Sequence, residues 1–256
     1  MKIGIFDSGL GGLSVLHHAL KVLPDAHFIY YADEEHVPYG EKSKEQIQGY
    51  VKEIIEFLIG KGVDAIVIAC NTATSVATKE FRETFSVPII GMEPAVKKAI
   101  ELYGNEERML VAATPVTITG DKLYNLVKRV DKQKKVDFIA LPGLVRFAED
   151  GIFDSQEIDD YLVEMLKIYD LEDYSTVILG CTHFNYFKKN FLNVFPKDIH
   201  FVDGNEGTIK QLIRKLPDKE YTGQKIEYYF SSRKINNEEL KDIHMYLKQL
   251  DKVYDV

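Results

Sequence analysis

The two cysteines of the chain, Cys70 and Cys181, are the residues that could do chemistry most directly. Each follows a short apolar run that is typical of a buried parallel strand, and each directly precedes a helical pattern. The N–H groups and the dipole at a helix start favour a thiolate, which acts as a base or a nucleophile. A single cysteine at the end of a strand is more often a small buried apolar residue. Because both cysteines have the same placement, we expect a paired chemical role.

The sequences around the two cysteines are similar. Residues 65–72 read Ala-Ile-Val-Ile-Ala-Cys-Asn-Thr, and residues 176–183 read Thr-Val-Ile-Leu-Gly-Cys-Thr-His. Strand-like and helix-like segments alternate in both halves, which is typical of α/β proteins. We therefore expect an α/β fold of two related lobes, each a mainly parallel sheet flanked by helices, with the active site in the cleft between them. We place the lobes at residues 1–96 and 97–206, and expect residues 207–256 to pack back on the first lobe.

The apolar patterns predict the elements that must position the cysteines. Expected strands lie at residues 2–6, 28–32, 65–69, 109–113, 136–140, 176–180 and 226–230. Expected helices lie at residues 13–23, 47–59, 122–130, 155–169, 184–191, 205–216 and 240–250, and Ser43 with Gln46 forms a capping box before the second of them. Residues 96–108 are a candidate crossing between the lobes. Ligands of open parallel sheets bind beyond the carboxyl ends of the strands, so the candidate site consists of Asp7, Ser8, Cys70, Asn71, Thr72, Thr114, Cys181, Thr182 and His183.

Other classes of function remain open at this point. The glycine-rich turn at residues 7–12, with Asp33 after the second strand, suggests a dinucleotide site, but Ser14 occupies the position of the third glycine. A tight turn or an anion-binding loop are the alternatives. Cys181 and His183 suggest a cysteine hydrolase, which needs one thiol only, whereas a lone histidine near a helix start is more often a structural hydrogen-bonding residue.

Composition excludes several partners. The 256 residues include 40 acidic and 32 basic side chains, which give a net charge of −8 and disfavour binding to nucleic acid. No apolar run approaches the length of a membrane span or a signal peptide, so we expect a cytoplasmic protein with reduced cysteines. The histidines have no metal-ligand spacing, and we expect no metal and no disulfide.

Six motifs occur in order along the chain, at residues 6–15 (FDSGLGGLSV), 32–33 (AD), 37–43 (VPYGEKS), 69–73 (ACNTA), 91–94 (GMEP) and 179–183 (LGCTH). On these motifs the chain resembles the glutamate racemases, cofactor-independent members of the aspartate/glutamate racemase superfamily, over about residues 1–212. The resemblance implies that Cys70 and Cys181 are the catalytic acid/base pair, with Asp7, Glu149 and His183 assisting them. It implies a substrate site made of Asp7, Ser8, Pro38, Tyr39, Gly40, Asn71, Thr72, Thr114, Thr117, Thr182 and His183.

The resemblance also implies a substrate and a role. Glutamate is the expected substrate, with aspartate as the alternative, and D-glutamate for peptidoglycan synthesis is the expected product. No cofactor is expected, and a homodimer stays an option. Racemisation removes a proton from one face of the α-carbon and adds one to the other, so two groups must flank the substrate. By resemblance, Cys70 acts on the D-enantiomer and Cys181 on the L-enantiomer. Asn185, where the family usually has proline, and Thr119-Gly120, in place of the usual serine, depart from the family pattern.

Overall fold

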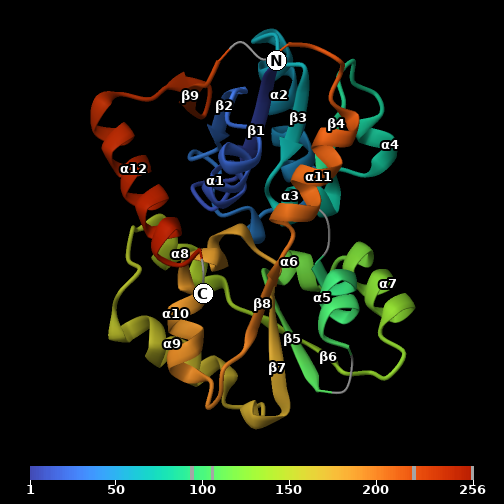
Figure 1. The fold of residues 1–256 in the computed structure, drawn as a ribbon, viewed down its shortest axis with the longest axis vertical. Helices are drawn as coiled ribbons and strands as arrows, with labels where there is room; N and C mark the ends of the chain where they lie inside the picture. Colours follow the sequence, from blue (N-terminus) through green and yellow to red (C-terminus); the bar gives the residue numbers. More distant parts are fainter. Residues whose placement is uncertain (93–94, 105–106, 221–222, 255–256) are drawn as a thin grey trace.

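The computed structural model describes residues 1–92, 95–104, 107–220 and 223–254, which form two α/β lobes stacked along the long axis of the molecule (Figure 1). Each lobe contains one sheet, and helices flank it. This arrangement confirms the expected fold of two lobes with mainly parallel sheets.

The sheet of the first lobe has six strands in the order β10-β9-β2-β1-β3-β4. Neighbouring strands run parallel, except that β10 is antiparallel to β9. Strand β9 comes from the C-terminal part of the chain and pairs with β2 along its whole length. The bounds are β1 (Lys2–Asp7), β2 (His27–Ala32), β3 (Ala65–Ile68), β4 (Ile89–Gly91), β9 (Lys225–Phe230) and β10 (Arg233–Lys234).

The sheet of the second lobe has four parallel strands in the order β6-β5-β7-β8. The bounds are β5 (Arg108–Ala113), β6 (Val136–Ala140), β7 (Tyr174–Leu179) and β8 (His200–Asp203). The sequence patterns do not predict β4 or β8, which are edge strands of three and four residues. Segments this short show no clear period, and pairing with β3 and β7 is what makes them strands.

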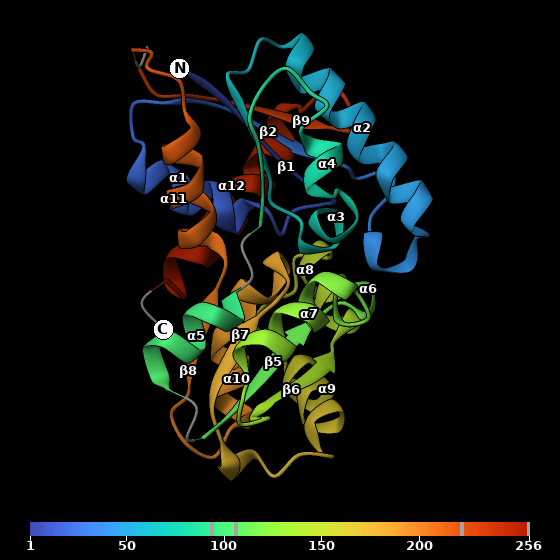
Figure 2. The ribbon, with the colours of Figure 1, turned by 90° about the vertical axis from the view of Figure 1, so that its right-hand side faces the viewer.

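Helices cover the sheets and connect the lobes (Figures 1 and 2). Around the first sheet lie α1 (Leu13–Val22), η1 (Tyr39–Glu41), α2 (Lys44–Gly60), α3 (Asn71–Val76), α4 (Lys79–Arg82), α11 (Asn205–Lys215) and α12 (Asn237–Lys252). Around the second lie α5 (Ala95–Tyr103), α6 (Pro115–Ile118), α7 (Asp121–Val130), α8 (Pro142–Glu149), α9 (Gln156–Leu166), η2 (Leu171–Asp173), η3 (Thr182–Phe187) and α10 (Lys188–Val194). Among the described residues, no helix is both long and apolar enough to cross a membrane.

The C-terminal elements contact both lobes. Helix α11 contacts α1, β3 and β4, whereas α12 contacts α1 and the η3 turn of the second lobe. The segment expected to cross between the lobes is largely helical, since it contains most of α5. This helix packs against α7, β7 and β8 and so belongs to the second lobe. The chain therefore passes between the lobes twice, from β4 to α5 and from β8 to α11.

The central strands are buried on both faces, as a continuous apolar run predicts. In β3, Ala65 and Val67 belong to one apolar cluster, while Ile66 and Ile68 belong to another on the opposite face. The first of these clusters extends into the second lobe, where it includes Leu110 and other residues of β5. This shared core joins the lobes behind the strand ends.

Two local expectations have different outcomes. The capping box is present, since Gln46 N donates to Ser43 Oγ at 3.2 Å and Ser43 N donates to Gln46 Oε1 at 3.0 Å. The expected helix at residues 184–191 instead begins as the 3₁₀ turn η3 and becomes α-helical only at Lys188. The side chains of η3 are all buried between α1, α8 and α12, so tertiary packing overrides the helical period.

Candidate active site

The polar residues that follow the parallel strands of both lobes meet in one cavity between the lobes. Helices α3, α6 and α8, which begin after β3, β5 and β6, lie where the lobes meet (Figures 1 and 2). Both cysteines line the cavity. The full lining consists of Ser8, Pro38, Tyr39, Gly40, Glu41, Cys70, Asn71, Thr72, Thr114, Pro115, Pro142, Val145, Cys181, Thr182 and His183.

Cys70 caps the start of α3 with its sulfur atom. Sγ accepts a hydrogen bond from Ala73 N at 3.3 Å, and the thiol donates to Ser8 Oγ at 3.7 Å. Burial raises the pKa of this thiol well above its ordinary value, and the nearby charge of Asp7 raises it further. The expectation that the helix start lowers this pKa is therefore wrong. Helix α3 has only six residues, and its dipole does not compensate for the loss of solvation.

Cys181 lies at the end of a buried chain of polar groups. Its Sγ is 3.6 Å from Nδ1 of His183, whose Nε2 hydrogen-bonds the carboxylate of Glu149. Oε1 of Glu149 also accepts from Leu10 N at 2.9 Å. Burial alone would lower the pKa of His183, but the charges of Glu149 and Cys181 together raise it well above its ordinary value. The ring therefore keeps its proton between the sulfur of Cys181 and the carboxylate of Glu149.

The glycine-rich turn makes room for this chain of groups. A β-carbon at Gly9 would stand 2.7 Å from Cδ of Glu149, and one at Gly11 would stand 2.5 Å from Nδ1 of His183. Both distances are shorter than real contacts allow. The turn is thus an anion-binding loop for a carboxylate of its own chain, which accounts for its glycines without a dinucleotide.

Asp7 lies behind the cavity and connects the lobes. Its Oδ2 accepts from Gly12 N at 2.5 Å, at the start of α1, and from the hydroxyl of Thr182 at 3.3 Å. Burial raises the pKa of Asp7. The charge of His183 lowers this pKa, and the charge of Glu149 raises it further. The carboxylate thus acts both as a helix-start residue and as a partner of the second lobe.

Three threonines form a cluster across the lobes. Thr72 Oγ1 lies 2.9 Å from Thr114 Oγ1, and Thr114 donates to Thr117 at 3.0 Å. Thr114 also caps α6 by accepting from Thr117 N. Thr72 and Thr114 line the cavity, whereas Thr117 lies behind them and supports their hydroxyl groups.

The turn before α2 contributes ring and backbone atoms rather than a free hydroxyl. The hydroxyl of Tyr39 donates to Asp33 Oδ2 at 2.5 Å, and burial together with that carboxylate raises its pKa. Its ring and the backbone of Gly40 line the cavity with Pro38. Tyr39 is thereby fixed and remains a neutral phenol.

The structure adds four lining residues that sequence reasoning did not find: Glu41, Pro115, Pro142 and Val145. Pro115 and Pro142 are the first residues of α6 and α8, directly beyond strands β5 and β6. The rule that selected Thr114 could have found both, because proline is common at the first position of a helix.

The departures from the family pattern are accommodated locally. Asn185, in place of proline, donates from Nδ2 to the carbonyl of Thr182 at 3.2 Å and so stabilises the turn that follows Cys181. Thr119 hydrogen-bonds the carbonyl of Pro115 and does not line the cavity. Glu93 and Pro94 of the fifth motif lie outside the described residues.

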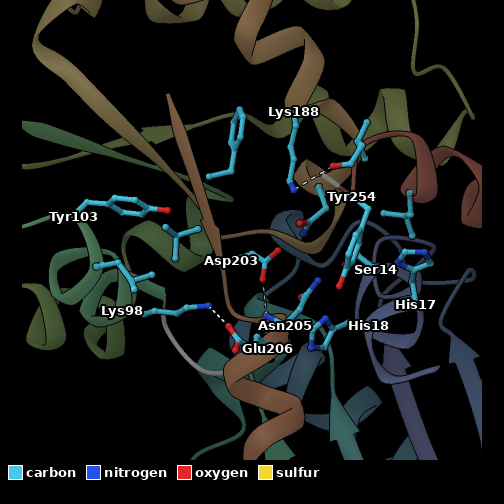
Figure 3. A pocket seen from close by; sticks show the side chains of 16 residues that line it. Ser14, His17, His18, Lys98, Tyr103, Lys188, Asp203, Asn205, Glu206 and Tyr254 are labelled. Carbon is cyan, nitrogen blue, oxygen red and sulfur yellow. Dashed lines mark hydrogen bonds and ion pairs between the residues drawn. The ribbon is translucent and has the colours of Figure 1, made fainter. Parts of the chain in front are cut away.

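A second cavity of about 240 Å³ lies where α1, α5, α11 and α12 approach one another (Figure 3). Lys98 and Glu206 form an ion pair on its wall, and His18 and Tyr254 also line it. Neither cysteine lines it. Within the described ranges, no cluster of three or more His, Cys, Asp or Glu side chains has a geometry that could hold a metal ion. The cavity lined by both thiols is therefore the candidate active site.

Comparisons with known proteins place the chain in a family. The model of the Asp/Glu/Hydantoin racemase family matches residues 12–212. The glutamate racemase of Campylobacter curvus (strain 525.92) is 51% identical over 265 residues, which cover 100% of both chains. Glutamate racemase from Francisella tularensis subsp. tularensis SCHU S4, solved in complex with D-glutamate, has a TM-score of 0.79 and 27% identity, covering 96% of this chain and 93% of that one.

A further solved structure, of Escherichia coli glutamate racemase with L-glutamate and the activator UDP-MurNAc-ala, has a TM-score of 0.77. It is 28% identical and covers 92% of this chain and 99% of its own. The fold, the site and these matches show that the chain belongs to the Asp/Glu/Hydantoin racemase family. Within this family it is an amino-acid racemase, and hence an isomerase.

Proposed function

We propose that the protein interconverts L- and D-glutamate without a cofactor, with Cys70 and Cys181 as the two acid/base groups. The observation that carries the proposal is that two thiols from different lobes line one cavity. The relatives named above are glutamate racemases, and two solved relatives contain D- or L-glutamate. These comparisons favour glutamate over aspartate.

The resting charges suit the removal of a proton from L-glutamate. The raised pKa of Cys70 keeps it as a thiol, and His183 keeps its proton beside the sulfur of Cys181. Cys181 as a thiolate would take the α-proton, and the Cys70 thiol would deliver its own proton to the opposite face. The reverse direction begins from the opposite protonation of the pair, with the Cys70 thiolate acting on D-glutamate.

The remaining polar groups can hold the substrate and its carbanion. Ser8, Asn71 and Thr72 come from the first lobe, and Thr114 and Thr182 come from the second. Hydrogen bonds from such groups and from backbone N–H groups to the α-carboxylate would stabilise the charge that develops when the proton leaves.

One observation supports a different class of enzyme. Cys181, His183 and Glu149 form a chain that resembles the nucleophile, base and orienting acid of a cysteine hydrolase. A hydrolase does not require Cys70, whereas a two-base racemase does. The variant Cys70→Ala therefore separates the two functions: racemisation is lost, and thiol-dependent hydrolysis would persist.

In the direct experiment, the purified protein is incubated with L-glutamate or D-glutamate in the presence of a chelator and without pyridoxal phosphate. Chiral chromatography then measures the two enantiomers of glutamate in the mixture. We expect each enantiomer to approach a racemic mixture, while L-aspartate reacts far more slowly. Aspartate as the better substrate, or a requirement for an added cofactor, would overturn the proposal.

We also propose a cellular role: the protein acts in the cytoplasm and supplies D-glutamate for peptidoglycan synthesis. The protein should restore growth of a bacterial strain that requires D-glutamate, and the Cys181→Ala variant should not. Failure of the wild-type chain to restore growth, despite racemase activity in the extract, would contradict this role.

A further inference from the structure

A hairpin from the C-terminal part of the chain contacts the substrate-lining turn, residues 33–41, which lead from β2 to the candidate active site. Phe230 of β9 pairs with Arg233 of β10. The loop between these strands consists of Ser231 and Ser232 alone. Because β9 also pairs with β2 along its whole length, this loop lies beside the end of β2. The proposed function uses the substrate-lining turn but gives the hairpin no role.

The two-residue loop has a backbone conformation that serine rarely adopts. Ser231 has a φ of 42° and Ser232 a φ of 69°, both in the left-handed region. Hairpin loops of this kind normally contain glycine, because a β-carbon makes a positive φ costly. Such strain persists only where the surrounding contacts maintain it. The contacts of the two serines therefore indicate what the loop does.

Ser231 makes three hydrogen bonds to the end of β2 and the start of the substrate-lining turn. Its hydroxyl donates to Asp33 Oδ1 at 3.2 Å and accepts from Glu35 N at 3.0 Å. Its N–H donates to the carbonyl of Ala32 at 2.9 Å. A glycine in its place would keep only the last of these bonds. The hydroxyl thus holds two groups of the turn that an unstrained glycine loop would release.

Asp33 extends this contact to the candidate active site. It is 2% exposed, and its carboxylate is hydrogen-bonded to the side chains of Ser231, His36 and Tyr39. Oδ1 bonds Ser231 and His36, and Oδ2 accepts from the hydroxyl of Tyr39 at 2.5 Å. Tyr39 lines the cavity with the adjacent Gly40. A continuous chain of hydrogen bonds therefore runs from the hairpin to a residue of the substrate site.

Ser232 shares the strain of Ser231 but not these contacts. Its side chain is exposed, and its hydroxyl lies 3.2 Å from the hydroxyl of Tyr31. Within the described part of the chain, that hydroxyl makes no hydrogen bond to residues 33–41. The loop thus provides a matched pair of strained serines, of which only Ser231 bonds the substrate-lining turn through its side chain.

We propose that Ser231 is a positioning residue for the substrate site: it holds Asp33, and through Asp33 it fixes the ring of Tyr39 and the backbone of Gly40 at the cavity. The C-terminal hairpin is then part of the support of the site. The kinetic effect of Ser231 rests on the proposed function, whereas its effect on the substrate-lining turn does not depend on the substrate.

Three variants separate the hydroxyl group from the strain. Ser231→Ala removes the hydroxyl and keeps the strain, Ser231→Gly removes both, and the control Ser232→Gly removes strain at the neighbouring residue only. Both Ser231 variants should raise KM for glutamate about five- to tenfold, the effect of losing one or two hydrogen bonds, with little change in kcat. Contacts from Tyr39 and Gly40 hold the substrate and the transition state alike, so their loss appears in KM. Ser232→Gly should keep the KM of the wild type.

Thermal unfolding distinguishes positioning from a purely structural role. Ser231→Gly should have a higher Tm than Ser231→Ala, because only the alanine variant keeps the strain. The two variants should nevertheless share the same raised KM, since both lack the hydroxyl. A KM for glutamate that stays at the wild-type value in both variants while only Tm changes would overturn the proposal.

A second measurement does not require racemisation. Hydrogen–deuterium exchange of residues 33–41 is followed by mass spectrometry without substrate. Both Ser231 variants should exchange faster there, because Glu35 N loses its partner and Asp33 loses one of its three, and Ser232→Gly should match the wild type. Unchanged exchange in both Ser231 variants would overturn the proposal. Faster exchange in a protein that does not racemise glutamate would support the contact and contradict the proposed function only.

Discussion

The backbone of Gly9 lies directly against the carboxylate of Glu149. A β-carbon at Gly9 would stand 2.7 Å from Cδ of Glu149 and 3.0 Å from its Oε2. The two residues belong to different lobes, and Leu10 N donates to the same carboxylate. This contact is one of the places where the geometry of the proposed active site depends on the absence of a side chain.

The substitution Gly9→Ala should therefore disable catalysis without unfolding the protein. The added methyl group displaces Glu149 and, through it, His183, and a misplacement of about 1 Å can cost about 100-fold in rate. The control is Gly49→Ala in helix α2, where a β-carbon would meet nothing within 4 Å. It should keep full activity and gain roughly 0.5–1 kcal/mol of stability. Steady-state kinetics and thermal unfolding check both variants, and an active Gly9→Ala enzyme would contradict the packing argument.

The two-thiol mechanism predicts where solvent hydrogen enters. In deuterium oxide, product from L-glutamate should carry deuterium at the α-carbon from the first turnover, because Cys70 delivers a proton other than the one that Cys181 removed. Cys70→Ala and Cys181→Ala should each abolish racemisation in both directions. Proton NMR and mass spectrometry of early product provide the measurement. Early product that retains the hydrogen of the substrate would refute transfer by two separate groups.

The dependence of kcat/KM on pH should be bell-shaped, because one thiol is ionised and the other protonated in the active form. The pKa values of Cys70 and His183 are both raised, so these groups lose their protons only at high pH. The alkaline decline should therefore begin only where Cys70 or His183 loses its proton. A rise in kcat/KM that continues through alkaline pH would contradict the acid role of Cys70.

Glu34, a half-buried residue in the turn after β2, should make folding stability depend on pH. Its pKa is about 8 in the folded chain against an ordinary 4.5, so the folded state keeps a proton that the unfolded state releases. The contribution of Glu34 to stability is complete below pH 4.5 and is lost as the pH rises toward 8. The Tm of Glu34→Gln relative to the wild type should therefore increase from pH 5 to pH 8. The same difference for Glu35→Gln should stay flat, and a flat difference for Glu34→Gln would show that Glu34 is already ionised in the folded protein.

Much of the candidate site could be predicted from the sequence, because its principal residues occupy positions with a local signal. Thr114 directly follows the apolar strand β5, and Cys70 and Cys181 follow β3 and β7 after one residue. The carboxyl ends of parallel strands are where ligands bind. The repeated placement of the cysteines predicted two lobes, and the strand and helix periods predicted most of the elements in between. These features depend on residues that are close together along the chain, so a single sequence is enough to predict them.

Tertiary structure alone decided the pKa values of the buried groups and the contacts between residues that lie far apart in the sequence. Leu10 and Glu149 are separated by 139 positions, and their hydrogen bond explains glycines that the sequence could only associate with a turn. Burial raised the pKa of Cys70, against the effect of the helix start, and raised the pKa of Glu34. Solvation and electrostatic interaction depend on distance in space, and residues far apart in the chain set them only once the lobes have folded together.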